Sequence, residues 1–177
     1  FGMGSPPIAD WTVPGINVTS SGVTISNILI SNFSVGILAF QADSLSLNSI
    51  NIEDIQGVGI HIDSSVGVTA TDMVVTESSS SNILVERNST DVSISNSLIG
   101  WSEESGIVVR EGSDFFEMSY VSVEGNEDYG CLISSDYADL SNVAITNNGL
   151  NGIYLTSSFG SSIIDSSFKA NGLSELK

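Results

Sequence analysis

The sequence predicts an all-β solenoid of short strands stacked coil upon coil, and two repeated patterns lead to this prediction. First, a Gly-Ile dipeptide or a close relative returns at intervals of about twenty residues along the 177-residue chain. A period in this range is typical of a repeat protein whose units contact only their neighbours. Second, apolar residues recur in register between the dipeptides, with a polar pair in the middle. The dipeptides begin at Gly15, Gly36, Gly59, Asn82, Gly106, Gly130, Gly152 and Gly172.

The first strand of each repeat follows the dipeptide, where apolar and other residues alternate as in a strand with one buried face. Cys131 takes the place of an isoleucine, so we expect a buried core side chain there. As the only cysteine, it excludes an internal disulfide. The inward residues predicted to form one continuous buried stack are Ile37, Ile60, Ile83, Ile107, Cys131 and Ile153.

Two further strands follow, separated by a step of three residues in which the chain turns a corner. Small polar pairs occupy the corner, and Asn, Asp and Ser suit tight bends because their side chains bond the local backbone. These pairs are Ser26-Asn27, Asn48-Ser49, Thr71-Asp72, Ser95-Asn96 and Ser141-Asn142. Three strands per coil, parallel from coil to coil, make a single-stranded parallel β-helix of about seven to eight coils.

Asn82 stands where the other repeats have glycine. We expect it to share the backbone conformation of the aligned glycines, because Asn tolerates positive φ better than other residues with a side chain.

Residues 145–155, ITNNGLNGIYL, resemble the repeat of right-handed parallel β-helix proteins of the pectate-lyase-like superfamily. The resemblance extends over roughly residues 15–173 and implies a right-handed coil. It leaves the function open, because that superfamily includes lyases, hydrolases, epimerases, phage tailspikes, adhesins and non-catalytic surface proteins. The predicted organisation is an N-terminal cap or lead-in over residues 1–14, followed by the β-helix over residues 15–177.

The composition limits the partners. With 21 acidic and 4 basic residues, the formal net charge is −17. Such a chain repels nucleic acid and anionic membrane surfaces, so we expect no nucleic-acid partner. No apolar run approaches the roughly 18 residues needed to span a bilayer, so we expect no membrane insertion. Glycosylation sequons at Asn17, Asn32 and Asn88 are compatible with an extracellular or cell-surface protein.

The outward face of the first strand carries the candidate catalytic residues. Carbohydrate-active members of the superfamily that this chain resembles usually bind their polymer on this face. Stacked coils lie about 4.8 Å apart, so Asp63, Glu86 and Arg110 should form a ladder, with His61 beside Asp63. These groups have the chemistry of a base, an acid and a charge stabiliser in attack on a uronic-acid polymer. The structural alternative is that Arg110 only neutralises two stacked acids.

Three observations favour a non-enzymatic role. The neighbours of these residues on the same face, Leu38, Phe40, Val108 and Leu132, are more apolar than a sugar-binding cleft usually is. Every connection is short, and no catalytic motif of pectin hydrolases or calcium-dependent lyases matches residue by residue. The sequence therefore favours an extracellular or cell-surface solenoid segment that serves as a spacer, an adhesin or a carbohydrate-contacting surface. The alternative is a polysaccharide lyase, hydrolase or epimerase.

Acidic residues gather in the connections that lead into successive coils. Because stacked carboxylates repel, they require water, salt or a hard cation, and calcium is the natural candidate cofactor. A solvated acidic edge is the alternative. The acids are Glu53, Asp54, Glu77, Glu103, Glu104, Glu127 and Asp128. Two aromatic residues, Trp101 and Tyr154, are candidate sugar-stacking side chains, and packing over the core is the other interpretation of Trp101.

The ends of a solenoid need covers, because a terminal coil leaves backbone groups and core side chains open. Trp11 and Ile8 are suited to cover the N-terminal end. The eighth coil begins at Asn171 and stops within a few residues, so we expect the chain to continue in a longer polypeptide or to stack on a partner. The expected partners are therefore a polysaccharide, a cell-surface protein or another solenoid end.

Overall fold

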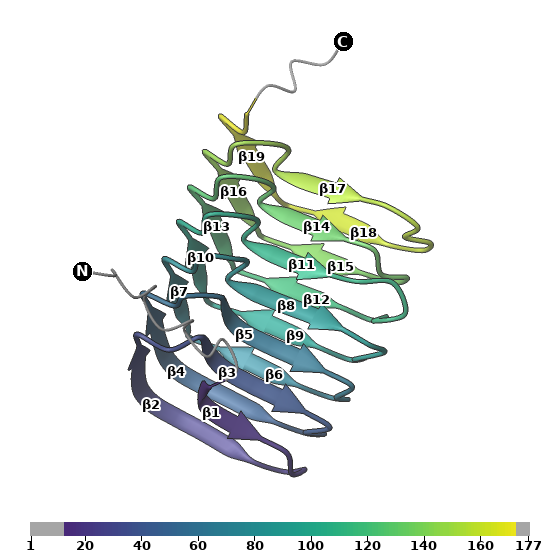
Figure 1. Cartoon of the computed structure of the whole chain (residues 1–177). Helices are drawn as coiled ribbons and strands as arrows, with labels where there is room; N and C mark the ends of the chain where they lie inside the picture. Colours follow the sequence, from purple (N-terminus) through teal and green to yellow (C-terminus); the bar gives the residue numbers. More distant parts are fainter. Residues whose placement is uncertain (1–12, 173–177) are drawn as a thin grey trace, which may run out of the picture.

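The computed structural model describes residues 13–172 and shows a parallel β-helix of about seven coils (Figure 1). All strand pairs in this part of the chain are parallel, and each strand pairs with its equivalent in the next coil. The predicted all-β solenoid is thus confirmed. Within the described residues there is no helix with the length and apolar character needed to cross a membrane.

One side of the coil is a seven-stranded sheet, formed by the strand that follows each Gly-Ile dipeptide. Its register aligns Ile16, Ile37, Ile60 and the equivalent residue of every later coil. In chain order, which is also the order in space, the strands are β1 (Pro14–Val18), β3 (Val35–Phe40), β5 (Val58–Asp63), β8 (Ile83–Glu86), β11 (Ile107–Val109), β14 (Cys131–Ile133) and β17 (Ile153–Leu155).

The other two sides belong to a twelve-stranded sheet, which is continuous because two long strands, β2 (Thr24–Ser31) and β4 (Ser46–Glu53), run round the corner between them. In later coils the corner divides the strand into two. The pairs are β6 (Thr69–Thr71) and β7 (Val74–Thr76), β9 (Ser93–Ser95) and β10 (Leu98–Gly100), β12 (Glu117–Ser119) and β13 (Ser122–Glu124), β15 (Asp139–Ser141) and β16 (Ala144–Thr146), and β18 (Ser162–Ile164) and β19 (Ser167–Lys169).

The polar pairs form the predicted corner, because the second residue of each pair has the left-handed backbone that turns the chain. The corner residues have φ between 47° and 57°. Asn and Asp accept this conformation more readily than other residues with a side chain. The column consists of Asn27, Ser49, Asp72, Asn96, Tyr120, Asn142 and Asp165.

The core is the column of inward side chains, and the predicted stack is confirmed. Ile37, Ile60, Ile83, Ile107 and Cys131 are buried, and Ile153 in the last strand of the seven-stranded sheet is partly buried. Cys131 is a free, fully buried thiol whose pKa is raised above its ordinary range by burial. Its role as a core side chain is therefore as predicted.

A column of polar side chains runs inside the solenoid beside this core. The Asn126 side-chain oxygen accepts hydrogen bonds from the Ser102 backbone N–H at 3.1 Å and the Ser102 hydroxyl at 2.8 Å. Its amide nitrogen donates to Asn148 Oδ1 at 2.8 Å, and Asn148 donates in turn to Asn171 Oδ1 at 2.8 Å. These buried amides satisfy one another from coil to coil, as buried polar groups must.

The predicted reason for asparagine at position 82, its tolerance of positive φ, is wrong. Neither the dipeptide glycines nor Asn82 has positive φ, so Asn82 shares this feature with them without the left-handed angle that we expected. Close approach explains the glycines instead. A Cβ at Gly59 would lie 2.5 Å from the Asn82 carbonyl oxygen in the next coil, and one at Gly130 equally close to the Gly152 carbonyl oxygen. Asn82 turns its side chain to donate to the Gly100 carbonyl at 2.8 Å.

This close approach predicts that Gly59→Ala lowers the free energy of unfolding by about 2 kcal/mol, within the usual range for overpacking. The added Cβ meets backbone, which can only move by separating two coils. Gly22→Asn is the control, because Gly22 has φ of 70° and no atom within 4 Å of an added Cβ. Since Asn accepts left-handed angles, we expect the control to change stability by less than about 0.5 kcal/mol. Urea denaturation of both variants measures the difference, and equal effects would contradict the explanation.

The length of the coil varies mainly in the connection that follows each strand of the seven-stranded sheet. Nine positions separate Ile107 from Phe116, but seven separate Cys131 from Ala138. Beyond that connection these two coils have the same spacing, with ten positions from Phe116 to Asn126 and from Ala138 to Asn148. The connection from Ser31 to Val35 is also one residue shorter than the equivalent connection from Glu53 to Val58. Changes in repeat length thus fall outside the two sides of the twelve-stranded sheet.

The predicted ends lie mostly outside the described residues. Of the N-terminal cap over residues 1–14, only Val13 and Pro14 are described, and Pro14 already begins β1. The residues that we expected to cover this end, Trp11 and Ile8, fall outside the described part. At the other end, Asn171 and Gly172 are the last described residues.

Candidate functional site

Five ionisable side chains meet on the outer face of the seven-stranded sheet, and we call them the His61 cluster. It consists of His61, Asp63, Glu86, Arg87 and Arg110. Strand alternation creates it, because β5 turns Ile60 and Ile62 inward and therefore turns His61 and Asp63 outward. The register between β5 and β8 adds Glu86 to the cluster, since Asp63 on β5 lies beside Glu86 at the end of β8.

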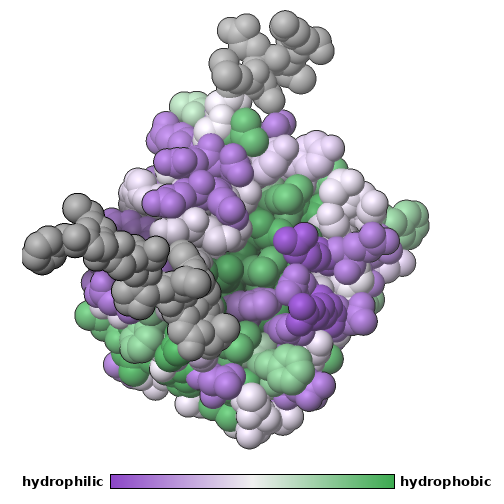
Figure 2. All heavy atoms as spheres, viewed as in Figure 1, coloured by the Kyte–Doolittle hydropathy of each residue, from purple (hydrophilic) through white to green (hydrophobic). Residues whose placement is uncertain are grey.

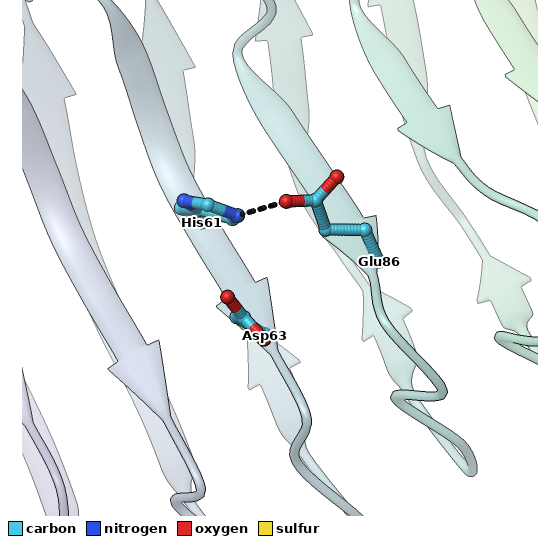
Figure 3. Close-up of side chains that lie close together, drawn as sticks. All are labelled: His61, Asp63 and Glu86. Atoms are coloured by element: carbon cyan, nitrogen blue, oxygen red, sulfur yellow. Dashed lines mark hydrogen bonds and ion pairs between the residues drawn. The ribbon is translucent and has the colours of Figure 1, made fainter.

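Glu86 is the centre of the cluster. Its Oε1 lies 3.0 Å from His61 Nε2, and Figure 3 shows this contact between neighbouring strands. Its Oε2 lies 3.2 Å from Arg110 Nε. Arg110 directly follows β11, and its backbone N–H donates to the Val85 carbonyl at 2.9 Å. The structure thus brings together the four residues that the sequence singled out. It pairs His61 with Glu86, however, and not with Asp63.

Asp63 has a different environment from the one expected of an outward residue, because it is 3% exposed. Arg87 covers it, with 2.6 Å between Arg87 Nη1 and Asp63 Oδ2, and the Ser64 hydroxyl donates to Oδ1 at 2.8 Å. Arg87 Nε also lies 3.7 Å from Glu86 Oε1. Two carboxylates therefore face two guanidinium groups, which balances the formal charge of the cluster.

Sequence reasoning missed Arg87. Simple alternation after Glu86 would turn the next side chain inward, where an arginine would be costly to bury. The backbone of Arg87 instead has φ of 55°, which ends the strand and leaves the side chain exposed beside Asp63. The available signal was its charge, because Arg87 is one of only four basic residues in the chain.

A shallow groove crosses the sheet beside the cluster. Two hollows meet at Val108, Arg110 and Leu132. One extends past Glu86, Arg87 and Glu111, and the other past Leu84, Tyr129 and Asp128. Figure 2 shows the apolar strip of this face hollowed between hydrophilic side chains. The predicted apolar character of this face is therefore present, with the cluster on one side of it.

The two predicted aromatic residues have different positions. Tyr154 is 46% exposed and belongs to the same outward column of the sheet as His61. The centroid of its ring lies 5.5 Å from that of Tyr129, at one end of the groove. Trp101 is 48% exposed but belongs to another side of the coil, where its ring lies over Gly125. Of the two, only Tyr154 lies on the face of the cluster.

The predicted calcium-binding acids lie at successive coils around the entry connections. Asp54 lies beside Glu77 in the next coil, because the backbone N–H of Ile55 donates to the Glu77 carbonyl, and the Asp128 backbone N–H donates to the Glu104 carbonyl. Asp54, Glu77 and Glu103 line a hollow beside Trp101. Over residues 13–172, however, the one group of three or more donor side chains whose ligand atoms converge is His61, Asp63 and Glu86, within 4.8 Å of one another. Calcium binding by Glu53, Asp54, Glu77, Glu103, Glu104, Glu127 and Asp128 stays a prediction.

Comparison with solved structures finds the same fold in proteins of low sequence identity. The Azotobacter vinelandii mannuronan C-5 epimerase AlgE4 A-module has a TM-score of 0.76 at 11% identity, over 88% of this chain and 55% of that one. The enzymatically active domain of bacteriophage CBA120 tailspike protein 2 has a TM-score of 0.74 at 15% identity, over 88% of this chain and 28% of the tailspike. The periplasmic alginate epimerase AlgG has a TM-score of 0.54 at 13% identity, over 81% and 48%. The chain thus spans from about a quarter to about half the length of these proteins.

No curated protein sequence matches the chain. A family model does match, however, and it is described as a right handed beta helix region and covers residues 7–113. This match includes more than half of the chain and agrees with the parallel coils of the structure. The chain therefore belongs to the family of right-handed parallel β-helix proteins.

Proposed function

We propose that this chain contacts an extracellular or periplasmic polymer of uronic acids through the groove of the seven-stranded sheet. The observation that carries this proposal is the side of the His61 cluster that faces solvent. Arg87 and Arg110 are 66% and 62% exposed, whereas the side chains of their partners, Asp63 and Glu86, are 4% and 16% exposed. In a chain of net charge −17, the cluster presents cationic groups outward.

The surroundings of the cluster suit a polymer of acidic sugars. Guanidinium groups bind carboxylates through paired hydrogen bonds, and the acidic remainder of the surface repels an anion elsewhere. The apolar strip at Val108 and Leu132, with Tyr129 at its end, offers contact area for sugar rings. The groove passes over several coils, which fits an extended chain of sugars better than a single small ligand.

The similar solved structures support this class of ligand. Two of them are named for epimerisation of mannuronan or alginate, and a third is an enzymatically active tailspike domain. The proposal includes a carbohydrate-contacting surface without catalysis, which is the role that the sequence favours.

A second candidate function is catalysis, and the His61–Glu86 pair favours it. An imidazole held at 3.0 Å by a carboxylate has a fixed orientation and is suited to act as a general base. In this mechanism Arg110 pairs with the substrate carboxylate while His61 removes the proton from the adjacent carbon. Return of a proton on the opposite face would give an epimer, and loss of the neighbouring glycosidic oxygen would give an unsaturated product. Either outcome needs Arg110 to stabilise the charge that develops on the carboxylate.

Isothermal titration calorimetry with oligomers of mannuronate and galacturonate, and with a neutral glucan, tests the contact surface. We expect binding of the acidic oligomers that weakens with salt. Arg110→Ala should weaken it at least about tenfold, the loss typical of a hydrogen bond to a charged group. Lys169→Ala is the matched control, because it removes the same charge from β19, away from the groove. Equal binding of the neutral glucan, or an equal loss in the control, would contradict the proposal.

The same oligomers separate contact from catalysis. Proton NMR of the products after long incubation reports both epimers and unsaturated ends. If His61 is the base, His61→Ala abolishes product formation while the oligomer still binds. If the parent chain binds the oligomers but forms no product, the catalytic function is excluded and the proposed contact surface is retained.

A further inference from the structure

The groove follows β11 across the sheet, and its two ends differ in charge. The two hollows that form it meet at Arg110. At the end of β11, Arg87 and Arg110 line the hollow together with Glu86 and Glu111. Glu86 Oε2 lies 3.2 Å from Arg110 Nε, and the exposed guanidinium groups of the two arginines are the positive charges of this end. The side chains here therefore carry as many positive as negative charges.

The hollow at the start of β11 is acidic. Two carboxylates line it, those of Glu104 and Asp128. They come from adjacent coils, and the Asp128 backbone N–H donates to the Glu104 carbonyl at 3.0 Å. Of the described residues that line this hollow, Arg110 is the one cation, and it is already paired with Glu86. A ligand carboxylate is therefore repelled here and attracted at the opposite end of the groove.

The acidic end has the chemistry to hold a sugar that donates hydrogen bonds. The Ser80 hydroxyl donates to Glu104 Oε2 at 2.7 Å, which orients the carboxylate. Ionised carboxylates only accept hydrogen bonds, so they match the hydroxyl and amide N–H groups of a sugar. Tyr129 lines the same hollow, with its ring centroid 5.5 Å from that of Tyr154. Aromatic rings of this kind combine apolar contact area with a polar tip.

We infer that the groove selects a polymer in which a uronic acid alternates with a sugar that has no carboxylate. This inference rests on the proposed function, in which the uronic acid pairs with Arg87 and Arg110. The sugar at the acidic end then donates hydroxyl or amide N–H groups to Glu104 and Asp128. A uniform polyuronate would instead place a carboxylate against these two acids. Glu104 and Asp128 are thus specificity-determining residues that act by repulsion of the wrong ligand.

Isothermal titration calorimetry with two acidic oligomers of equal length tests this inference. One is a hyaluronan oligomer, which alternates glucuronate with N-acetylglucosamine, and the other is an oligomer of galacturonate. A chelator in the buffer keeps calcium from bridging carboxylates. We expect the parent to bind the hyaluronan oligomer at least about fivefold more tightly, the effect of one like-charge contact at about 4 Å in water.

The double variant Glu104→Gln/Asp128→Asn removes the repulsion and keeps the shape of both side chains. We expect it to bind the galacturonate oligomer at least about fivefold more tightly than the parent does. Its affinity for the hyaluronan oligomer should change less, because that ligand places no carboxylate at the acidic end. Circular dichroism establishes that the variant is folded.

Glu117→Gln/Asp139→Asn is the matched control. These two acids are also neighbours in adjacent coils, and Asp139 Oδ1 accepts a hydrogen bond from the Ser162 hydroxyl at 2.7 Å. They lie on the twelve-stranded sheet, so the control removes the same two charges from another side of the coil. The galacturonate affinity of the control should stay within about twofold of the parent value, because salt screens distant charges.

The possible outcomes separate this inference from the proposed function. If the groove variant gains no galacturonate affinity, or the control gains as much, the inference is overturned. A parent that binds the galacturonate oligomer as tightly as the hyaluronan oligomer overturns it as well. In these cases, binding that is still weakened by Arg110→Ala leaves the proposed function intact. If neither oligomer binds the parent, the proposed function fails and the inference fails with it.

Discussion

Replacement of Ile107 by alanine is expected to lower the free energy of unfolding by about 2–5 kcal/mol, the usual range for truncation of a large core side chain. Ile107 is fully buried, and its neighbours in the column are Ile83 and Cys131. Coils above and below are held apart at a fixed spacing by the strand hydrogen bonds, so the surroundings cannot collapse into the space that the truncation leaves.

Urea denaturation followed by circular dichroism measures this loss. Leu29→Ala is the control, because Leu29 is also a branched aliphatic residue in a strand but is 61% exposed. We expect a change within about 0.5 kcal/mol there. A loss at Ile107 no larger than the loss at Leu29 would mean that the core column is not packed as described.

Replacement of Asn126 by alanine is expected to cost about 3 kcal/mol, from one buried donor left without a partner and from the space left by the amide. The Ser102 backbone N–H loses its acceptor, and the Asn82 amide loses one of its two acceptors. The bond to Asn148 Oδ1 is lost as well. All these groups lie inside the solenoid, where water does not replace the missing partner.

A second variant, Asn126→Leu, separates hydrogen bonding from packing because the leucine side chain has the same number and branching of heavy atoms as that of asparagine. If the hydrogen bonds stabilise the column, the leucine variant is destabilised as well, and thermal unfolding detects it. Recovery of parental stability in Asn126→Leu would show that only volume matters at this position. Asn17→Ala, on the exposed face of β1, controls for the loss of an asparagine from a strand.

The fold was predictable because its constraints are local and repeated. Alternation fixes which face of a strand is buried, and a one-residue slip would turn Ile60 outward, so the register follows from the pattern alone. The function of the dipeptide glycines was not predictable in this way. It depends on how closely the Gly59 backbone approaches the next coil, and that distance belongs to the stacked structure and not to any single repeat. The inward direction of the Asn126 and Asn148 side chains was likewise not predictable, because both residues lie in polar stretches whose composition is typical of a turn.

The residues of the candidate site that lie on strands, or follow one directly in register, were predictable. His61, Asp63, Glu86 and Arg110 were found by counting outward positions, and the structure brings them together. Arg87 was missed because it lies past the end of a strand, where a left-handed residue ends the alternation. For the same reason the burial of Asp63 could not be foreseen, since it depends on the guanidinium that covers it.

The variable connection after each strand of the seven-stranded sheet gives this scaffold a place for change. Glu86, Arg87 and Arg110 lie where β8 and β11 pass into such connections, the ones in which neighbouring coils differ in length. A loop inserted there would rise beside the groove while the ten-residue path around the other two sides stayed intact. Directed evolution or loop grafting could therefore give the groove walls of new height and new ligand preference, coil by coil, without a redesigned core.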